Sequence, residues 1–461
     1  MGKKPAPLSL LPSNNHYLLF RDKPFLLVTS SEHYGALLNT GFDYIRYFNE
    51  LVECGNNATR MFSGYYHEIP GIFSIQKNTL APEKDAFICP WTRTSVPGAG
   101  DGGNKYDLDK FDDAYFDRLY KICKAASERG IVIEFTLFCV FYPQEHDGGL
   151  WEIAPFHHAN NVNGIERVGI ADAYSMNNRI LISYQKKFVK KIVAFLNEFD
   201  NIYYEICNEP YFDANTLEWQ NHIAKIIKET EYSLPNKHLI GVNVTNGYEA
   251  IQKPNEDISI FSFHYSNGDC MKANAGLHKV VGCNETGFAG MEETYYRRQA
   301  WELFMSGCAA YIGLDYSFAA GYEDGSFIGK DQPGVSSKTF RKQLGAMKDF
   351  LVEADVFNMT PDNGFIAKCF FGNGFFRGMS DHDGGYAIYA VGASWFELNL
   401  QNGLYDVEWL NPISLMKVDT CVECSQNSIK IVPPQSVLGD GSVSTELAVR
   451  LKLRHTKSSP N

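Results

Sequence analysis

The chain has 461 residues, of which 44% are hydrophobic and 21% are charged. This composition is ordinary for a globular protein and excludes a disordered or coiled-coil chain. The length exceeds one ordinary core and predicts a large domain with a smaller one. Because the net charge is −12, the chain repels phosphate backbones and anionic lipid, and we expect neither nucleic acid nor a membrane as a partner.

The cysteines and the lengths of the apolar segments indicate the cellular compartment in which the protein is expected. No stretch approaches the ~18 uncharged apolar residues that a bilayer span needs. The eleven cysteines are an odd number and do not follow disulfide-framework spacings. They are typical of free thiols in a reducing compartment. We therefore expect a cytoplasmic protein, and an export signal outside this sequence stays open.

Strand-type and helix-type segments alternate from residue 17 to about 355, after an opening hairpin over 17–27. A helix or helix-like segment is expected after each strand, and two long insertions, 65–106 and 142–175, are predicted as loops. The pattern predicts a (β/α)₈ TIM barrel over 15–355. A doubly wound open sheet is the rival fold, but no glycine-rich phosphate loop follows the first strand. The eight predicted strands are 26–30, 58–62, 131–141, 202–207, 239–244, 258–264, 280–283 and 310–315.

The pattern changes after about residue 356. Tyr405, Val407 and Trp409 alternate with acidic residues just after an Asn-Gly turn, and a second alternating segment spans 447–453. Period-two alternation between turns indicates antiparallel strands. We therefore predict a C-terminal antiparallel β-sandwich over 356–456.

Two glutamates stand at the ends of predicted barrel strands. Asn208-Glu209-Pro210 ends the fourth strand, and Glu285 ends the seventh. In a barrel, both positions lie on the C-terminal face, where active sites are built. A lone glutamate there more often pairs with an arginine or caps a helix. Two carboxylates converging on one face favour glycoside hydrolysis, which needs one protonated and one ionised carboxyl group.

With these motifs the sequence resembles the clan A glycoside hydrolases, which are retaining (β/α)₈ glycosidases. The resemblance implies that Glu209 is the general acid/base and Glu285 the nucleophile. It implies that Asn208 binds the substrate 2-hydroxyl and that Arg60, near the end of strand two, holds Glu285 ionised. The Phe263-His264-Tyr265 segment after strand six matches the clan loosely, so that Tyr265 would donate to the nucleophile and His264 would line the sugar site.

The sequence also departs from the clan pattern. The clan commonly carries a tryptophan sugar platform after strand eight, where this chain has Tyr316 as a possible substitute. His33 after strand one and Trp151 in the third insertion are further candidates for sugar contact, with an exposed loop position as the alternative for Trp151. The barrel followed by Tyr405-x-Val407-x-Trp409 also resembles, more loosely, the apiosidase-like group with a terminal sandwich.

These observations predict a retaining β-glycosidase acting on an oligosaccharide or polysaccharide, without a metal ion or organic cofactor. The main alternative is a non-catalytic carbohydrate-binding (β/α)₈ protein. A metal-dependent hydrolase on the same fold is a third class, but a His-x-His motif on strand one is absent. Sequence patterns leave open the sugar, the linkage, exo or endo action and the oligomeric state, because specificity lies in the long loops.

Overall fold

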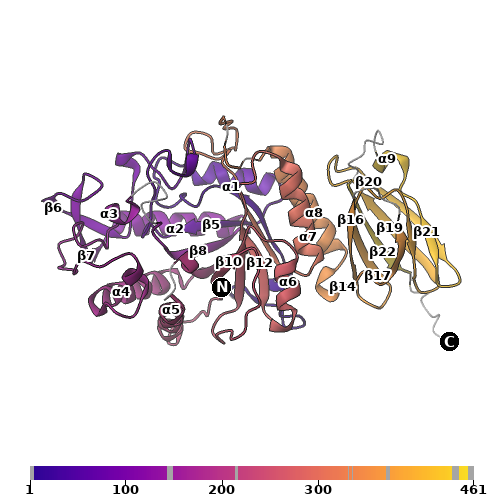
Figure 1. Cartoon of the computed structure of the whole chain (residues 1–461), viewed down its shortest axis with the longest axis horizontal. Helices are drawn as coiled ribbons and strands as arrows, with labels where there is room; N and C mark the ends of the chain where they lie inside the picture. Colours follow the sequence, from indigo (N-terminus) through magenta and orange to yellow (C-terminus); the bar gives the residue numbers. More distant parts are fainter. Residues whose placement is uncertain are drawn as a thin grey trace.

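The computed structural model describes residues 5–142, 149–212, 216–330, 332–334, 336–369, 374–438 and 446–454. A barrel and a C-terminal sandwich lie end to end along the long axis of the molecule. Helices α7 (Glu293–Met305) and α8 (Lys338–Glu353) lie between them (Figure 1). The last two positions of the predicted sandwich, 455 and 456, lie outside the described residues.

The barrel contains eight parallel strands hydrogen-bonded in the order β4-β13-β12-β11-β10-β9-β8-β5. Each strand lies within two residues of its predicted position at the start and the end, because buried runs of apolar and β-branched residues mark parallel strands clearly. The bounds are β4 (Leu27–Ser31), β5 (Ala58–Phe62), β8 (Val132–Cys139), β9 (Ile202–Asn208), β10 (Ile240–Asn246), β11 (Ile260–His264), β12 (Val280–Glu285) and β13 (Ala310–Leu314). The predicted parallel barrel is confirmed.

Two asparagines join β4 to β5, the first and last strands of that order. The Asn57 amide oxygen accepts a hydrogen bond from the Val28 N–H at 2.9 Å, and the Asn57 N–H donates to the Val28 carbonyl at 3.1 Å. The Asn56 amide oxygen accepts from the Ser30 N–H at 2.9 Å. Side-chain amides therefore satisfy the backbone groups of β4 that face β5.

The helices follow the strands with one exception. The chain between β10 and β11, residues 247–259, is described throughout and contains no helix. The expectation of a helix or helix-like segment after every strand is therefore wrong at this position, where only a short polar connection joins the two strands. The other helices of the barrel layer are α1 (Tyr44–Glu53), α2 (Asp113–Glu128), α3 (Leu150–Ile153), α4 (Arg179–Leu196), α5 (Thr216–Glu231) and α6 (Asp269–Asn274).

The first long insertion is more ordered than its composition suggests. Its C-terminal part forms an antiparallel hairpin of β6 (Trp91–Pro97) and β7 (Asn104–Phe111), where a loop was predicted. Glycines 98 and 102 have positive φ values of 100° and 76°, which the turn requires. The buried Trp91 packs against aromatic rings of the barrel layer, and this tertiary contact holds the hairpin in place.

The N-terminal hairpin is confirmed. Strands β1 (Ser9–Leu10), β2 (Leu18–Phe20) and β3 (Lys23–Phe25) form a small antiparallel sheet that leads directly into β4. Residues Arg21 and Asp22 both have positive φ, 50° and 61°, as a two-residue hairpin turn requires.

The C-terminal domain consists of a six-stranded and a three-stranded antiparallel sheet, which confirms the predicted β-sandwich. The strand orders are β14-β16-β17-β22-β19-β20 and β15-β18-β21. Alternate residues of β19, such as Tyr405, Val407 and Trp409, face the core between the sheets. The bounds are β14 (Thr360–Pro361), β15 (Ile366–Cys369), β16 (Phe375–Ser380), β17 (Gly385–Val391), β18 (Phe396–Leu398), β19 (Gly403–Leu410), β20 (Lys417–Cys424), β21 (Ile429–Ile431) and β22 (Glu446–Leu453), with a short helix α9 (Gln435–Leu438).

Barrel and sandwich share one buried ionic contact. Glu446 of β22 is fully buried and accepts hydrogen bonds from Arg297 of α7 at 2.9 Å, from Arg298 at 3.0 Å and from the Tyr389 hydroxyl at 3.0 Å. The Trp301 ring of α7 stacks on Tyr389, with 4.9 Å between ring centroids. The two domains are therefore docked through a desolvated interface.

Replacing Glu446 with alanine should destabilise this interface strongly. Arg297 would remain buried without its carboxylate, and breaking a buried pair in this way costs about 3–5 kcal/mol. We expect the urea midpoint of unfolding to fall accordingly. The matched control is Glu423→Ala at an exposed position of β20, which should leave the midpoint within experimental error. Equal midpoints for the two variants would show that the ion pair does not stabilise the docked domains.

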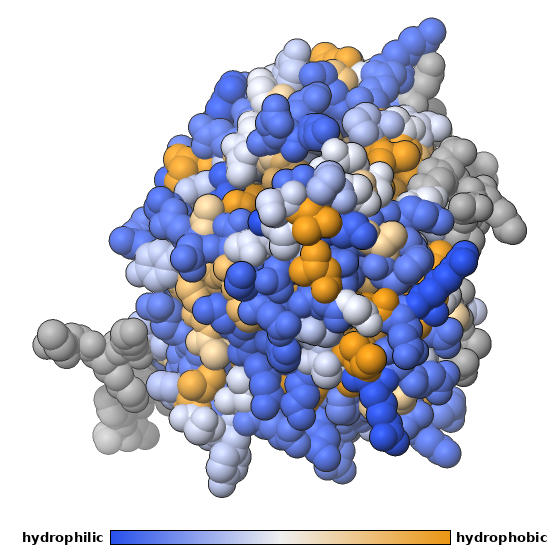
Figure 2. Space-filling model, turned by 90° about the vertical axis from the view of Figure 1, so that its left-hand side faces the viewer, coloured by the Kyte–Doolittle hydropathy of each residue, from blue (hydrophilic) through white to orange (hydrophobic). Residues whose placement is uncertain are grey.

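The surface at the barrel end of the molecule is mainly hydrophilic. Figure 2 shows this face, on which hydrophobic side chains lie in small groups separated by hydrophilic ones. Among the described residues, helices of a length and apolarity sufficient to cross a membrane are absent.

Candidate active site

A cavity of about 450 Å³ lies at the C-terminal ends of the barrel strands. Both strand-end glutamates, Glu209 and Glu285, line it, together with Asn208, Tyr265 and His33. The parallel arrangement explains this convergence, because the carboxyl ends of all eight strands meet on one face of a barrel. The structure thus brings five of the predicted site residues to one cavity.

Glu285 is the last residue of β12 and is held by three donors. Its carboxylate accepts hydrogen bonds from the Tyr34 hydroxyl at 3.1 Å, the Tyr265 hydroxyl at 2.6 Å and the Arg60 guanidinium at 3.1 Å. These donors come from the ends of three other strands, so that the barrel itself fixes the carboxylate. A carboxylate so held is oriented to act as a nucleophile or an electrostatic stabiliser.

Glu209 follows β9 directly and faces a different set of donors. Its carboxylate contacts His264 Nδ1 at 3.0 Å and accepts from the hydroxyls of Tyr142 and, at 3.0 Å, Tyr211. Its backbone N–H donates to the Asn243 side chain at 2.8 Å. Tyrosine hydroxyls and an imidazole can return protons to a carboxylate, which an acid/base residue requires.

Five residues that line the cavity have left-handed backbone conformations: Phe73 in the loop after β5, with φ 54°, and four residues that follow barrel strands. The φ values of these four are 59° for Tyr34, 49° for Glu209, 50° for Tyr265 and 54° for Phe288. Non-glycine residues in this region store on the order of 1 kcal/mol or more each and persist where surrounding structure imposes them. The concentration of four of them at the ends of four barrel strands supports this cavity as the functional site.

Arg60 of β5 is fully buried beneath the cavity and carries the local positive charge. Besides Glu285, it contacts Glu134 at 2.9 Å and Glu205, and it donates to the Asn208 side-chain oxygen at 2.8 Å. Glu205, which lies four residues before Glu209 on β9, thus pairs with a buried cation. Burial and the neighbouring Glu205 charge raise the pKa of Glu134 to about 8. Arg60 therefore links the nucleophile candidate to the residue predicted to bind the 2-hydroxyl.

The two candidate catalytic carboxylates lie close together. One carboxylate oxygen of Glu209, one of Glu285 and a ring nitrogen of His264 all lie within 4.8 Å of one another. Retaining glycosidases hold their two carboxyl groups about 5–5.5 Å apart, whereas inverting enzymes need about 6.5–9.5 Å. The side chains of these three residues are also of the kinds that bind divalent cations as ligands. However, the Arg60 guanidinium beside Glu285 opposes a second positive charge there.

The protonation of Glu209 is coupled to that of His264. Burial alone would raise the pKa of Glu209, but hydrogen bonds from His264, Tyr142 and Tyr211 outweigh it and hold the pKa below its usual value. Burial opposes charge on His264, but the Glu285 and Glu209 carboxylates outweigh it and raise the pKa of the imidazole. These directions favour an ionised Glu209 carboxylate beside a protonated His264, an ion pair that holds one proton at the cavity.

Three predicted sugar contacts lie elsewhere. Trp151 packs against Phe141, with 5.1 Å between ring centroids, because its insertion folds the indole inward; it does not line the cavity. Tyr316 is buried behind His33 and Phe288, at ring separations of 5.3 and 6.1 Å, and is no exposed platform. His264 is buried beneath the carboxylates, so it contacts them instead of lining the sugar space.

Several residues of the site were not predicted to act there. Tyr34, Tyr142 and Tyr211 contact the carboxylates, and Glu68 lines the cavity from the loop after β5. Tyr34 and Tyr211 stand within two residues of a strand-end motif, which is a usable signal. Tyr142 and Glu68 lie in long insertions, whose path the sequence pattern does not reveal.

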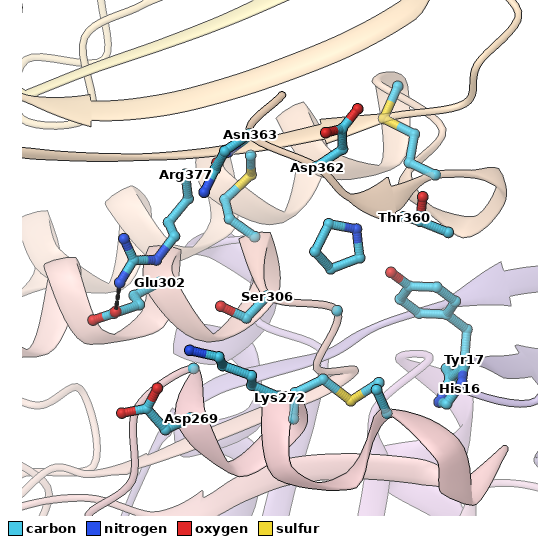
Figure 3. A pocket seen from close by; sticks show the side chains of 18 of the residues that line it. His16, Tyr17, Asp269, Lys272, Glu302, Ser306, Thr360, Asp362, Asn363 and Arg377 are labelled. Atoms are coloured by element: carbon cyan, nitrogen blue, oxygen red, sulfur yellow. Dashed lines mark hydrogen bonds and ion pairs between the residues drawn. The ribbon is translucent and has the colours of Figure 1, made fainter. Parts of the chain in front are cut away.

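A larger cavity of about 610 Å³ lies between the barrel and the sandwich (Figure 3). Figure 3 shows Asp269 and Lys272 of α6 facing Asp362, Asn363 and Arg377 of the sandwich side. Its Arg377 is engaged by Glu302, and Asp362 accepts from Ser380. It contains neither candidate catalytic carboxylate, so we place the active site in the smaller cavity.

Comparisons with known proteins find solved structures with a similar fold. No family model and no curated protein matches the sequence. A candidate glycoside hydrolase from Bacteroides vulgatus superposes with a TM-score of 0.68 at 14% identity, over 98% of this chain and 84% of that chain. A family 5 glycoside hydrolase from the same organism superposes with a TM-score of 0.65 at 12% identity, over 97% of this chain and 92% of that chain. A family 5 mannosidase from Rhizomucor miehei superposes with a TM-score of 0.51 at 13% identity, over 76% of this chain and 100% of that chain.

The similarities to the two bacterial structures extend over nearly the whole of this chain. The structural neighbours are glycoside hydrolases, and family 5 is a clan A family, so the resemblance predicted from the two glutamate motifs is confirmed for the fold. The looser resemblance to the apiosidase-like group stays a prediction.

Proposed function

We propose that the chain is a retaining β-glycosidase that hydrolyses an oligosaccharide or polysaccharide. The single observation that carries the proposal is the pair of carboxylates, Glu209 and Glu285, within 4.8 Å of each other in one cavity. Their different donors support different roles. Glu285 accepts hydrogen bonds from Arg60 and two tyrosines, which orient it for attack, whereas Glu209 contacts His264, a side chain that can carry a proton.

In the first step, Glu285 attacks the anomeric carbon and forms a glycosyl ester, while Glu209 gives a proton to the departing oxygen. His264 Nδ1, 3.0 Å from Glu209, replenishes the proton on that carboxyl group. Formation of the ester removes the negative charge of Glu285. This lowers the pKa of Glu209, because a nearby anion no longer disfavours its ionised form.

In the second step, Glu209 takes a proton from water, and the hydroxide oxygen attacks the same carbon and releases Glu285. Two displacements on one carbon return the original anomeric configuration. Asn208, held by the Arg60 guanidinium at 2.8 Å, is placed to bind the 2-hydroxyl of the sugar in both steps. No step needs a cofactor.

The test is a panel of aryl β- and α-glycosides, with the first-formed product anomer followed by proton NMR. We expect hydrolysis of at least one β-glycoside, initial release of the β-anomer and no loss of rate with a chelator. Initial release of the α-anomer would contradict retention. Binding of glycans by a protein inert towards every glycoside would instead favour the carbohydrate-binding alternative, and inhibition by the chelator would favour the metal-dependent hydrolase.

We also propose a reducing, cytoplasmic location. All eleven cysteines are free in the structure, and nine of them are buried. Buried thiols in a chain of this size are typical of proteins that fold where thiols stay reduced.

A further inference from the structure

Three loops at the mouth of the barrel are joined to one another. The loop after β5 contacts the loop after β13, because Gln76 donates to the Lys330 carbonyl at 2.5 Å and the Lys77 ammonium lies 5.3 Å from the centre of the Tyr322 ring. The loop after β12 is joined to the loop after β13 by a hydrogen bond from the Gly290 N–H to the Pro333 carbonyl at 3.1 Å.

These joined loops border one half of the barrel mouth, and we name their described residues the rim wall. Strands β5, β4, β13 and β12 are consecutive around the barrel, so that the joined loops lie side by side along one half of its mouth. Strand β9, which carries Glu209, lies across the barrel from β13. Since Glu209 protonates the departing group, that group leaves on the β9 side, and the sugar that becomes attached to Glu285 lies against the rim wall.

The inner surface of the rim wall carries a buried carboxylate that the mechanism does not use. Glu68 is 4% exposed, lines the cavity and accepts hydrogen bonds from the Tyr66 hydroxyl at 2.9 Å and from Asn78. An ionised carboxylate has about four acceptor positions, so about two remain for a ligand. Burial raises the pKa of Glu68 to about 7.

His33 stands beside Glu68 on the same surface. Its Nδ1 atom lies 4.0 Å from the Glu68 carboxylate, beyond hydrogen-bond distance, and has no hydrogen-bond partner among the described residues. Burial lowers the pKa of His33 to about 4, so that the ring is neutral near pH 7 and offers one donor and one acceptor. A hydroxyl group can accept from such a ring and donate to the carboxylate at the same time.

We infer that Glu68 and His33 bind adjacent hydroxyl groups of a non-reducing terminal sugar on the rim-wall side of the cavity, and that the enzyme removes terminal sugars. The inference rests on the proposed glycosidase function and deepens it. The joined loops of the rim wall lie where a sugar beyond the one attached to Glu285 would extend. The cavity volume of about 450 Å³ is at the small end of the ~300–1,000 Å³ found for ligand sites, which suits one terminal unit better than an internal stretch of a chain.

The first test uses oligosaccharides of the sugar that the aryl-glycoside panel identifies, labelled with a fluorophore at the reducing end. We expect early products to be the labelled chain shortened by one unit and the free monosaccharide. Labelled products of several lengths at early times would show internal cleavage. That result would overturn the inference while leaving the glycosidase proposal intact, whereas an enzyme inert on every glycoside would refute both.

The second test compares Glu68→Gln with Glu83→Gln, an exposed glutamate of the same insertion. On the parent aryl glycoside we expect Glu68→Gln to lower kcat/KM about 10- to 100-fold, the usual effect of losing a charge-assisted hydrogen bond, chiefly through KM. The control should match the wild type. On the 3-deoxy or 4-deoxy glycoside that lacks the bound hydroxyl, the difference between Glu68→Gln and wild type should disappear.

An equal loss on the parent and on both deoxy glycosides would show that Glu68 only supports the loop, and would overturn its assignment. The wild-type enzyme supplies a test that does not depend on the folding of a variant. It should itself hydrolyse the critical deoxy glycoside about 10- to 100-fold less efficiently than the parent. Equal efficiency on all three glycosides would contradict the proposed hydroxyl contact.

Discussion

Replacing Glu285 with glutamine should reduce kcat on every glycoside substrate by ~10⁴–10⁶-fold, the range seen when a covalent nucleophile or its activating partner is removed. The amide cannot form the glycosyl ester, so the route through a covalent intermediate is closed. The variant should still fold. Arg60 keeps Glu134 and Glu205 as ion-pair partners, and the Tyr34 and Tyr265 hydroxyls can donate to the amide oxygen. Initial rates and a thermal unfolding midpoint measured together check both statements.

The intermediate itself gives a direct readout. A 2-deoxy-2-fluoro glycoside of the active sugar, with a good leaving group, should inactivate the wild-type enzyme and add one glycosyl mass to the peptide that contains Glu285. The exposed Glu292→Gln variant should be inactivated at the wild-type rate. Attachment of the label to another carboxylate would assign the nucleophile to that residue instead.

Replacing Glu209 with alanine should have an effect that depends on the leaving group. For a glycoside with a poor leaving group we expect a loss of ~10²–10⁴-fold in kcat/KM, the usual contribution of a general acid. For an activated aryl glycoside the first step needs little protonation, so kcat/KM should fall much less and the glycosyl ester should accumulate. Azide, which needs no general base, should then raise kcat and give a β-glycosyl azide.

The pH profile separates this role from a structural one. In the wild type, kcat/KM should fall at high pH, when the proton held by the Glu209–His264 pair is lost, and this limb should be absent in Glu209→Ala. The control is Glu249→Ala, an exposed glutamate after β10, which should keep the wild-type profile. A loss of equal size for all leaving groups, without azide rescue, would show that Glu209 supports the fold and not proton transfer.

Local sequence predicted the barrel strands well because burial on both faces leaves a strong pattern. The run from Val132 to Cys139 is continuously apolar except for Glu134 and Thr136, and both side chains reach the Arg60 network inside the barrel. The same logic failed for the hairpin β6–β7. Its strands alternate weakly, and their position depends on Trp91 packing against rings that are distant in the sequence.

The aromatic residues show the same limit. Trp151 and Tyr316 were candidates for sugar contact, but both are buried against neighbouring rings. Tyr34, Tyr142 and Tyr211 instead direct their hydroxyls at the two carboxylates. A tyrosine has the same identity in a core and in a site, and only the backbone path of its loop determines which groups its hydroxyl meets.

The sequence by itself determined the order of the strands, the two-domain plan and the positions of Glu209 and Glu285 at strand ends, because periodicity and short motifs are local properties. Tertiary structure alone decided that these carboxylates lie within 4.8 Å of each other. It also decided that Glu68 and His33 reach the cavity and that three rim loops join into a wall. These features depend on contacts between side chains from separate strands and insertions. The spacing of such residues along the sequence does not reveal which of them come into contact.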